Sequence, residues 1–257
     1  MGKIIVQIYE VQTPSEAEKL IALGVDHIGS VVVSAESWKI QSIVDTIQVV
    51  GAGDARSSLI PLFSDCDAVL RTLDFYQPDI VHFCESLVFQ NDDASACQDL
   101  LALQENVKKR FPGIKIMRSI PIAPAGVSDR VPTLKLARRF EPVSDYFLTD
   151  TLLLKASGGP EADQPVKGFV GITGRTCDWD VAAKLVESSR IPVILAGGIS
   201  PENVFDGILH VRAAGVDSCT GTNAVDSDGV SVRFKKDLNK VKRLVEEVHR
   251  AEQTLSN

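Results

Sequence analysis

The residues best suited to chemistry stand at the ends of two short apolar segments in the last third of the chain. Residues 193–196 run into two glycines, and residues 214–219 run into a threonine and a third glycine. Glycines at strand ends let a ligand approach the backbone, and Ser200, as the N-cap of a following helix, adds free amides that favour an anion. The sequence therefore predicts a phosphate site. Its expected members are Gly197, Gly198, Thr220, Gly221 and, from the preceding loop, Gly174.

Four further side chains fall at or near the carboxyl ends of predicted strands. They are Tyr9, His82, Cys84 and Asp150. In barrels of parallel strands the active site lies at this end, so a carboxylate such as Asp150 is a candidate for acid or base chemistry. The plainer interpretation of Asp150 is a carboxylate that orders a loop or caps a helix.

Apolar runs that are typical of buried strands alternate with helical patterns along the whole chain. Strands are expected at 4–9, 27–33, 59–63, 79–83, 114–120, 143–148, 193–196 and 214–219. A helix follows each one, including 37–50, a helix capped by Asp65, one from Pro201, and a last helix over 236–252. Strict alternation requires parallel strands with right-handed crossovers. Eight units in this length predict an α/β fold, a single (β/α)8 TIM barrel over residues 1–257, with an open doubly wound sheet as the alternative.

Composition narrows the classes of function. The 257 residues are 44% hydrophobic and carry a formal net charge of −7. An acidic chain is a poor candidate for binding nucleic acid or an anionic membrane surface, whereas backbone amides can still bind a phosphorylated metabolite. The five cysteines are scattered and lack metal-type spacing, and the sequence has no leader or membrane-spanning run. We therefore expect a cytoplasmic protein without a metal or cofactor. It is expected to be a monomer or a homodimer.

Four blocks, taken in order, resemble the phosphoribosylanthranilate isomerase family of tryptophan biosynthesis. They are Thr149-Asp150, Gly171-Ile172-Thr173-Gly174-Arg175-Thr176-Cys177-Asp178-Trp179, Leu195-Ala196-Gly197-Gly198-Ile199-Ser200-Pro201-Glu202-Asn203-Val204, and Val216-Asp217-Ser218-Cys219-Thr220-Gly221-Thr222-Asn223. The resemblance implies a (β/α)8 barrel, a phosphate site and an Amadori rearrangement of an aminoaldose to an aminoketose. It also implies that Asp150 is the general acid that protonates the sugar ring oxygen.

The first half of the chain departs from the family pattern where the base is expected. The family opens with Lys-Ile-Cys-Gly, whose cysteine is the general base, and the aligned residues here are Gln7-Ile8-Tyr9-Glu10. Tyr9 is a poor base because its ordinary pKa is about 10. Glu10, His82 and Cys84 remain as candidates, although His82 is equally consistent with a hydrogen-bonded core histidine and Cys84 with a small buried side chain.

Two cations are candidates for contacting the substrate. The family's Ser-Pro-Arg becomes Ser37-Trp38-Lys39, which leaves Lys39 in place of the arginine, and Arg175 stands close to the predicted phosphate site. Both are equally consistent with solvated surface side chains. Together with Tyr9, they complete the expected substrate-binding set.

Three functions remain open at this stage. The first is an isomerase of this family acting on a phosphoribosyl substrate. The second is a non-catalytic barrel that binds a phosphosugar and has lost the base, and the third is a barrel with a different reaction on a phosphorylated substrate. The fold alone cannot separate them, because barrels support many chemistries.

Overall fold

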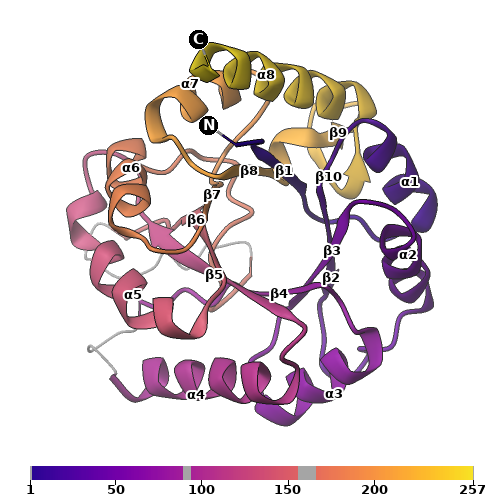
Figure 1. The fold of residues 1–257 in the computed structure, drawn as a ribbon, viewed down its shortest axis with the longest axis vertical. Helices are drawn as coiled ribbons and strands as arrows, with labels where there is room; N and C mark the ends of the chain where they lie inside the picture. Colours follow the sequence, from indigo (N-terminus) through magenta and orange to yellow (C-terminus); the bar gives the residue numbers. More distant parts are fainter. Residues whose placement is uncertain (1, 89–93, 156–165, 257) are drawn as a thin grey trace.

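Eight parallel strands close into a barrel, which Figure 1 shows along its axis inside a ring of helices. This computed structural model describes residues 2–88, 94–155 and 166–256. The strands are β1 (Ile5–Ile8), β2 (His27–Val32), β3 (Arg56–Pro61), β4 (Ile80–Phe83), β5 (Lys115–Ile122), β6 (Tyr146–Thr151), β7 (Val193–Leu195) and β8 (Gly215–Ser218). The first strand pairs with the last, with Val6 opposite Val216. The barrel prediction is therefore confirmed, and the open sheet is excluded.

One helix follows each barrel strand. The helices are α1 (Pro14–Ala22), α2 (Gln41–Gly51), α3 (Cys66–Tyr76), α4 (Ala94–Arg110), α5 (Thr133–Phe140), α6 (Trp179–Ser188), α7 (Val204–Val211) and α8 (Leu238–Ser256). The predicted cap at Asp65 is confirmed, since its carboxylate accepts from the Ala68 N–H at 2.8 Å. Asp178 caps α6 in the same way through the N–H groups of Asp180 and Val181. These caps satisfy backbone donors that a helix start leaves unpaired.

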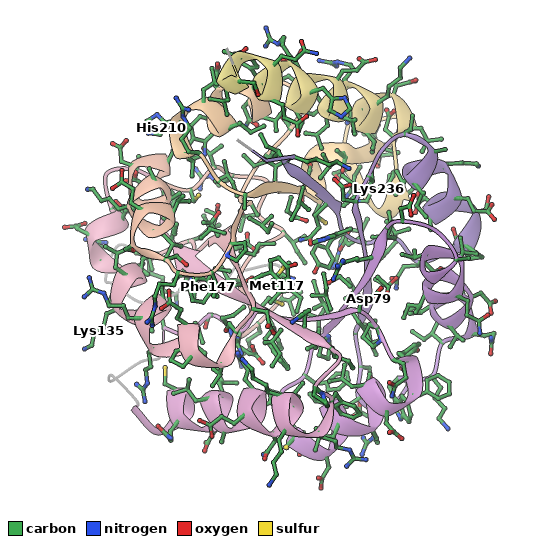
Figure 2. The ribbon with its side chains drawn as sticks, in the orientation of Figure 1. Asp79, Met117, Lys135, Phe147, His210 and Lys236 are labelled. Carbon is green, nitrogen blue, oxygen red and sulfur yellow. The ribbon has the colours of Figure 1, made fainter. Side chains whose placement is uncertain are left out.

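Side chains alternate along each strand between the barrel interior and the layer beneath the helices. On β1, Val6 and Ile8 pack with apolar residues of the surrounding helices. Gln7 and the following Tyr9 point the other way and contact partners inside the barrel. Figure 2 shows Met117 near the barrel axis, whereas Lys135 extends outward from the helical ring. This alternation decides which residues at the strand ends can reach the mouth of the barrel.

An antiparallel hairpin between β8 and α8 was not expected from the sequence. It consists of β9 (Asn223–Val225) and β10 (Ser231–Lys236). Asp226 Oδ1 accepts hydrogen bonds from the N–H groups of Asp228 and Val230, and Gly229 takes a positive φ of 80°. An Asp-Gly pair between β-branched residues is a readable hairpin signal. As a consequence, the last helix begins at Leu238 and not at Lys236.

Two further predicted helix starts were wrong. α2 begins at Gln41 and not at Ser37, because the Tyr76 hydroxyl donates to Trp38 O and accepts from the Ile40 N–H, which holds this segment extended. α7 begins at Val204 and not after Ser200. There the Asn203 side chain accepts from the Ser200 N–H and donates to Gly198 O, both at 2.9 Å, which closes a separate turn before the helix.

Candidate active site

A cavity opens at the carboxyl ends of the barrel strands. Its walls include all five predicted phosphate-site residues together with Tyr9, Glu10, His82, Cys84 and Asp150. Residues from β1, β4, β6, β7 and β8 therefore meet in one place, although they are spread over more than 200 positions of the chain. The structure thus brings together every candidate site residue except Lys39 and Arg175.

The glycine-rich loops after β7 and β8 pack directly on one another and on the loop before α6. A Cβ on Gly198 would lie 2.5 Å from the carbonyl carbon of Arg175, and one on Gly221 would lie 2.3 Å from Ile199 O. Gly174 and Gly198 both have φ near +65°. Within the described residues, no acceptor is hydrogen-bonded to the amides of these two glycines. Free amides in a closely packed glycine turn form a concavity that binds anions.

Asp150 lies on the wall of the same cavity, near the end of β6. Its Oδ1 accepts from the Thr151 N–H at 2.9 Å, and a Cβ on Gly171 would lie 2.2 Å from its Oδ2. Gly171, with φ of 102°, therefore leaves room for this carboxyl group. Burial raises the pKa of Asp150 to about 7, against the opposing hydrogen bond from Thr151. A carboxyl group that is partly protonated near neutral pH can deliver a proton to a substrate.

Tyr9 and His82 belong to a buried chain of hydrogen bonds across the barrel. The Tyr9 hydroxyl bonds Ser58 Oγ at 2.6 Å and His82 Nδ1 at 2.9 Å, and His82 Nε2 bonds Ser119 Oγ at 2.8 Å. Burial lowers the pKa of His82 to about 3 and raises that of Tyr9 well above its ordinary value. Both rings are therefore neutral, and both nitrogens of His82 are occupied. This arrangement matches the core-histidine interpretation.

The two other candidate bases have different surroundings. Cys84 is buried, and burial raises the pKa of its thiol well above the ordinary value, helped by the negative charges of Glu85 and Asp150. Glu10 follows β1 with φ of 64° and is 1% exposed. Its Oε1 accepts from Arg233 Nε at 2.7 Å, so β10 of the hairpin reaches the edge of the cavity. Its Oε2 is buried and has no hydrogen-bond partner among the described residues.

The two predicted cations lie in different places. Lys39 is not on the cavity wall, because its Nζ lies 5.0 Å from the ring centre of Trp38 and 5.3 Å from that of Phe75. Arg175 lines a neighbouring cavity that shares Gly174, Gly198, Thr220 and Gly221 with the main one. Arg175 is thus positioned beside the glycine turns, whereas Lys39 is not.

The sequence reasoning missed one acidic residue of this cavity, Asp217. It lies on β8 opposite Gln7 of β1, and it is 7% exposed. Burial raises its pKa to about 8; a hydrogen bond from Gln7 opposes this rise and the charge of Asp150 adds to it. Asp217 lies two residues before Cys219, so both side chains point to the same face of the strand. The sequence could therefore have indicated that Asp217 faces the cavity.

The family model for N-(5'-phosphoribosyl)anthranilate (PRA) isomerase matches residues 113–247, just over half of the chain. The chain belongs to the phosphoribosylanthranilate isomerase family. It is similar to the N-(5'-phosphoribosyl)anthranilate isomerase of Methanothrix thermoacetophila, with 30% identity over 91% of this chain and 92% of that protein. The isomerase of Methanocella arvoryzae is 32% identical over 56% of this chain, a match that spans only about half (55%) of that relative's length.

Solved isomerase structures share the barrel. The phosphoribosyl anthranilate isomerase of Thermotoga maritima superposes with a TM-score of 0.64 at 18% identity, covering 96% of this chain and 99% of that chain. No helix in the described part of the chain is long and apolar enough to cross a membrane. The same residues contain no group of three or more His, Cys, Asp or Glu side chains that could hold a metal ion.

Proposed function

We propose that this protein is a phosphoribosylanthranilate isomerase, which converts the aminoaldose N-(5'-phosphoribosyl)anthranilate to the corresponding aminoketose in tryptophan biosynthesis. The observation that carries the proposal is the presence of Asp150 and the glycine turns after β7 and β8 in one cavity. The substrate has a phosphate at one end of its ribose and a reacting carbon at the other. A single cavity with an anion site and an acid suits such a molecule.

The phosphate is assigned to the turns that contain Gly174, Gly198 and Gly221. Their backbone amides supply the hydrogen bonds, and Arg175 adds a positive charge from the neighbouring cavity. Binding energy from this remote group holds the sugar ring in place over Asp150. The phosphate site thereby fixes which end of the ribose faces the carboxyl group.

Asp150 is assigned as the general acid. Its proton passes to the ring oxygen as the bond from that oxygen to C1 breaks, and the nitrogen lone pair forms a C1=N bond. A pKa of about 7 keeps a large fraction of Asp150 protonated at neutral pH. Protonation of a leaving oxygen by a positioned carboxyl group contributes about 10²–10⁴-fold in rate.

The test is turnover of phosphoribosylanthranilate by the purified protein. Wild type is expected to form product and to restore growth of a tryptophan auxotroph that lacks this isomerase. Asp150→Asn, which keeps the shape and removes the acid, is expected to do neither while still binding ribose 5-phosphate. Tight binding of ribose 5-phosphate without turnover in wild type would favour the non-catalytic phosphosugar-binding barrel.

A further inference from the structure

The proposed reaction also needs a base, and Asp217 has the position for one. It lies on β8 in the barrel interior, and its side chain forms part of the same cavity wall as Asp150. Asp150 is close enough for its charge to act on Asp217. Two carboxyl groups therefore face one substrate volume from strands β6 and β8.

The contacts of Asp217 leave one of its oxygens available. Gln7 Nε2 donates to Oδ1 at 3.1 Å, and Gln7 Oε1 is itself bonded to His27 Nδ1 at 3.0 Å. This buried His27–Gln7 pair fixes the orientation of the carboxyl group. Within the described residues, Oδ2 has no hydrogen-bond donor, and it is not among the fully buried oxygens that lack a partner. The free oxygen of a carboxyl group held in this way is the acceptor that a proton transfer requires.

The other candidates lack this combination. The Cys84 thiol is buried with a raised pKa, and both nitrogens of His82 are hydrogen-bonded. Glu10 is ion-paired with the partly exposed Arg233, so taking up a proton would weaken that pair. Apart from Asp150, which is already assigned as the acid, Asp217 is thus the carboxyl group on the described cavity wall that has an open oxygen, a fixed orientation and no cation bonded to it.

We propose that Asp217 is the catalytic base of this protein and takes the proton that other family members transfer to the cysteine replaced here by Tyr9. The inference rests on the proposed isomerase function. After ring opening, the C2 proton passes to Asp217, the C2–H electron pair forms a C1=C2 double bond, and the C1=N electron pair returns to nitrogen. The resulting enolamine becomes the ketone when its C2 hydroxyl loses a proton and C1 gains one.

The proton count of the carboxyl pair is unchanged over one turnover. Asp150 starts protonated and Asp217 ionised, the reaction reverses these states, and one proton must return from Asp217 to Asp150. Burial gives pKa values of about 7 for Asp150 and about 8 for Asp217. Near neutral pH the two carboxyl groups share one proton, and the molecules in which Asp150 holds it are the reactive ones.

The test compares Asp217→Asn with wild type. The amide keeps an Oδ1 acceptor for Gln7 and removes the base, so kcat is expected to fall about 10²–10⁴-fold while the affinity for ribose 5-phosphate stays within threefold. Wild type is expected to show a bell-shaped pH profile of kcat/KM, and Asp217→Glu is expected to retain partial activity. Adding Tyr9→Cys to Asp217→Asn is expected to restore part of the lost turnover.

The outcomes separate the two proposals. An active wild type whose Asp217→Asn variant keeps kcat within threefold overturns the role of Asp217 and leaves the isomerase function standing. A wild type without turnover overturns the isomerase function, and the base assignment falls with it. If Asp217 only held Gln7 in place, Asp217→Asn would keep both limbs of the pH profile, and this result would also overturn the proposal.

Discussion

The ring of Tyr9 occupies the space in which Gly29 would carry a side chain. A Cβ on Gly29 would lie 2.0 Å from Tyr9 Cδ1 and 2.2 Å from Cε1. The tyrosine that follows β1 is therefore accommodated by a glycine on the neighbouring strand β2.

The first prediction concerns this pair. Gly29→Ala is expected to destabilise the protein by about 1–3 kcal/mol, because the added methyl group must displace a fully packed ring. In a Tyr9→Cys background the same change should cost much less, since the small thiol leaves that space open. Denaturant midpoints of the four proteins measure the coupling. Equal costs of Gly29→Ala in both backgrounds would show that the contact is not the cause.

The second prediction isolates the charge at the phosphate site. A Cβ on Gly174 would meet only the side chain of Thr220, with Cγ2 nearest at 3.4 Å, so a side chain fits there, unlike at Gly198. Asp and Asn have the same shape and both tolerate a positive φ. Gly174→Asp is expected to weaken ribose 5-phosphate binding at least about tenfold relative to Gly174→Asn, because it adds a negative charge beside the phosphate. Titration calorimetry at low salt tests this, and equal affinities would place the phosphate elsewhere.

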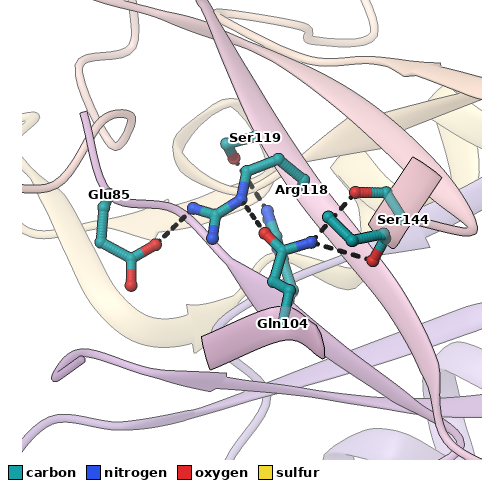
Figure 3. A network of polar contacts seen from close by, with 7 residues as sticks. Glu85, Gln104, Arg118, Ser119 and Ser144 are labelled. Atoms are coloured by element: carbon teal, nitrogen blue, oxygen red, sulfur yellow. Dashed lines mark hydrogen bonds and ion pairs between the residues drawn. The ribbon is translucent and has the colours of Figure 1, made fainter. Parts of the chain in front are cut away.

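The third prediction concerns the buried ion pair beneath α4 and α5. Figure 3 shows Arg118 between Glu85 and Gln104, and the Arg118 side chain has no exposed surface. Its guanidinium also lies against two aromatic rings, with Cζ 5.2 Å from the ring centre of Phe83 and 4.9 Å from that of Phe140. Glu85→Gln is expected to cost about 3–5 kcal/mol, because it leaves a buried cation without its anion.

Arg118→Met in the Glu85→Gln background provides the control for that prediction. Removing the cation as well should recover part of the loss, since a neutral side chain of similar length replaces an uncompensated charge. Thermal unfolding of both variants measures the effect. A loss below 1 kcal/mol for Glu85→Gln alone would mean that the pair contributes no more than an exposed one.

The fourth prediction concerns the pH dependence of stability. The pKa values of Asp150 and Asp217 are raised from 3.8 to about 7 and about 8. Between pH 4 and these values the folded protein holds protons that the unfolded chain has released, so the free energy of unfolding falls as pH rises. Each group contributes about 1.4 kcal/mol per pH unit. The free energy of unfolding of Asp217→Asn, taken relative to that of wild type, should therefore rise by about 4 kcal/mol between pH 5 and pH 8.

Urea midpoints of the two proteins at pH 5 and pH 8 give this difference. A stability difference that does not change with pH would show that Asp217 titrates as it does in the unfolded chain.

The fold was predictable because its signals are local and repeat eight times. Apolar runs mark the strands and glycine or proline ends most of the helices, and the order alone requires parallel pairing. The error at Ser37 arose because Tyr76, a residue of α3, holds Trp38 outside α2, and this contact depends on tertiary packing that no periodicity reveals. The error at Ser200 arose because the neighbouring Asn203 closes a local turn before α7.

The candidate site was predictable to a smaller extent. The glycine turns and Asp150 could be placed because they directly follow apolar runs. Burial decides between the candidate bases, and sequence does not report it: the thiol of Cys84 and the ring of His82 became unsuitable only through their surroundings. Asp217 could have been predicted from the alternation of side chains along β8, because it lies two residues before Cys219.

The contact of Arg233 with Glu10 joins residues 223 positions apart, and β1 and β8 are joined across a similar span. During synthesis at about 5–20 residues per second, the first strand waits tens of seconds or less for these partners. The barrel cannot close until the last strand and the hairpin have left the ribosome. Until then the carboxylate of Glu10 stays hydrated. Closure of the barrel therefore joins segments that are far apart in the sequence, and the binding cavity cannot form before the residues of β8 and the hairpin have been synthesised.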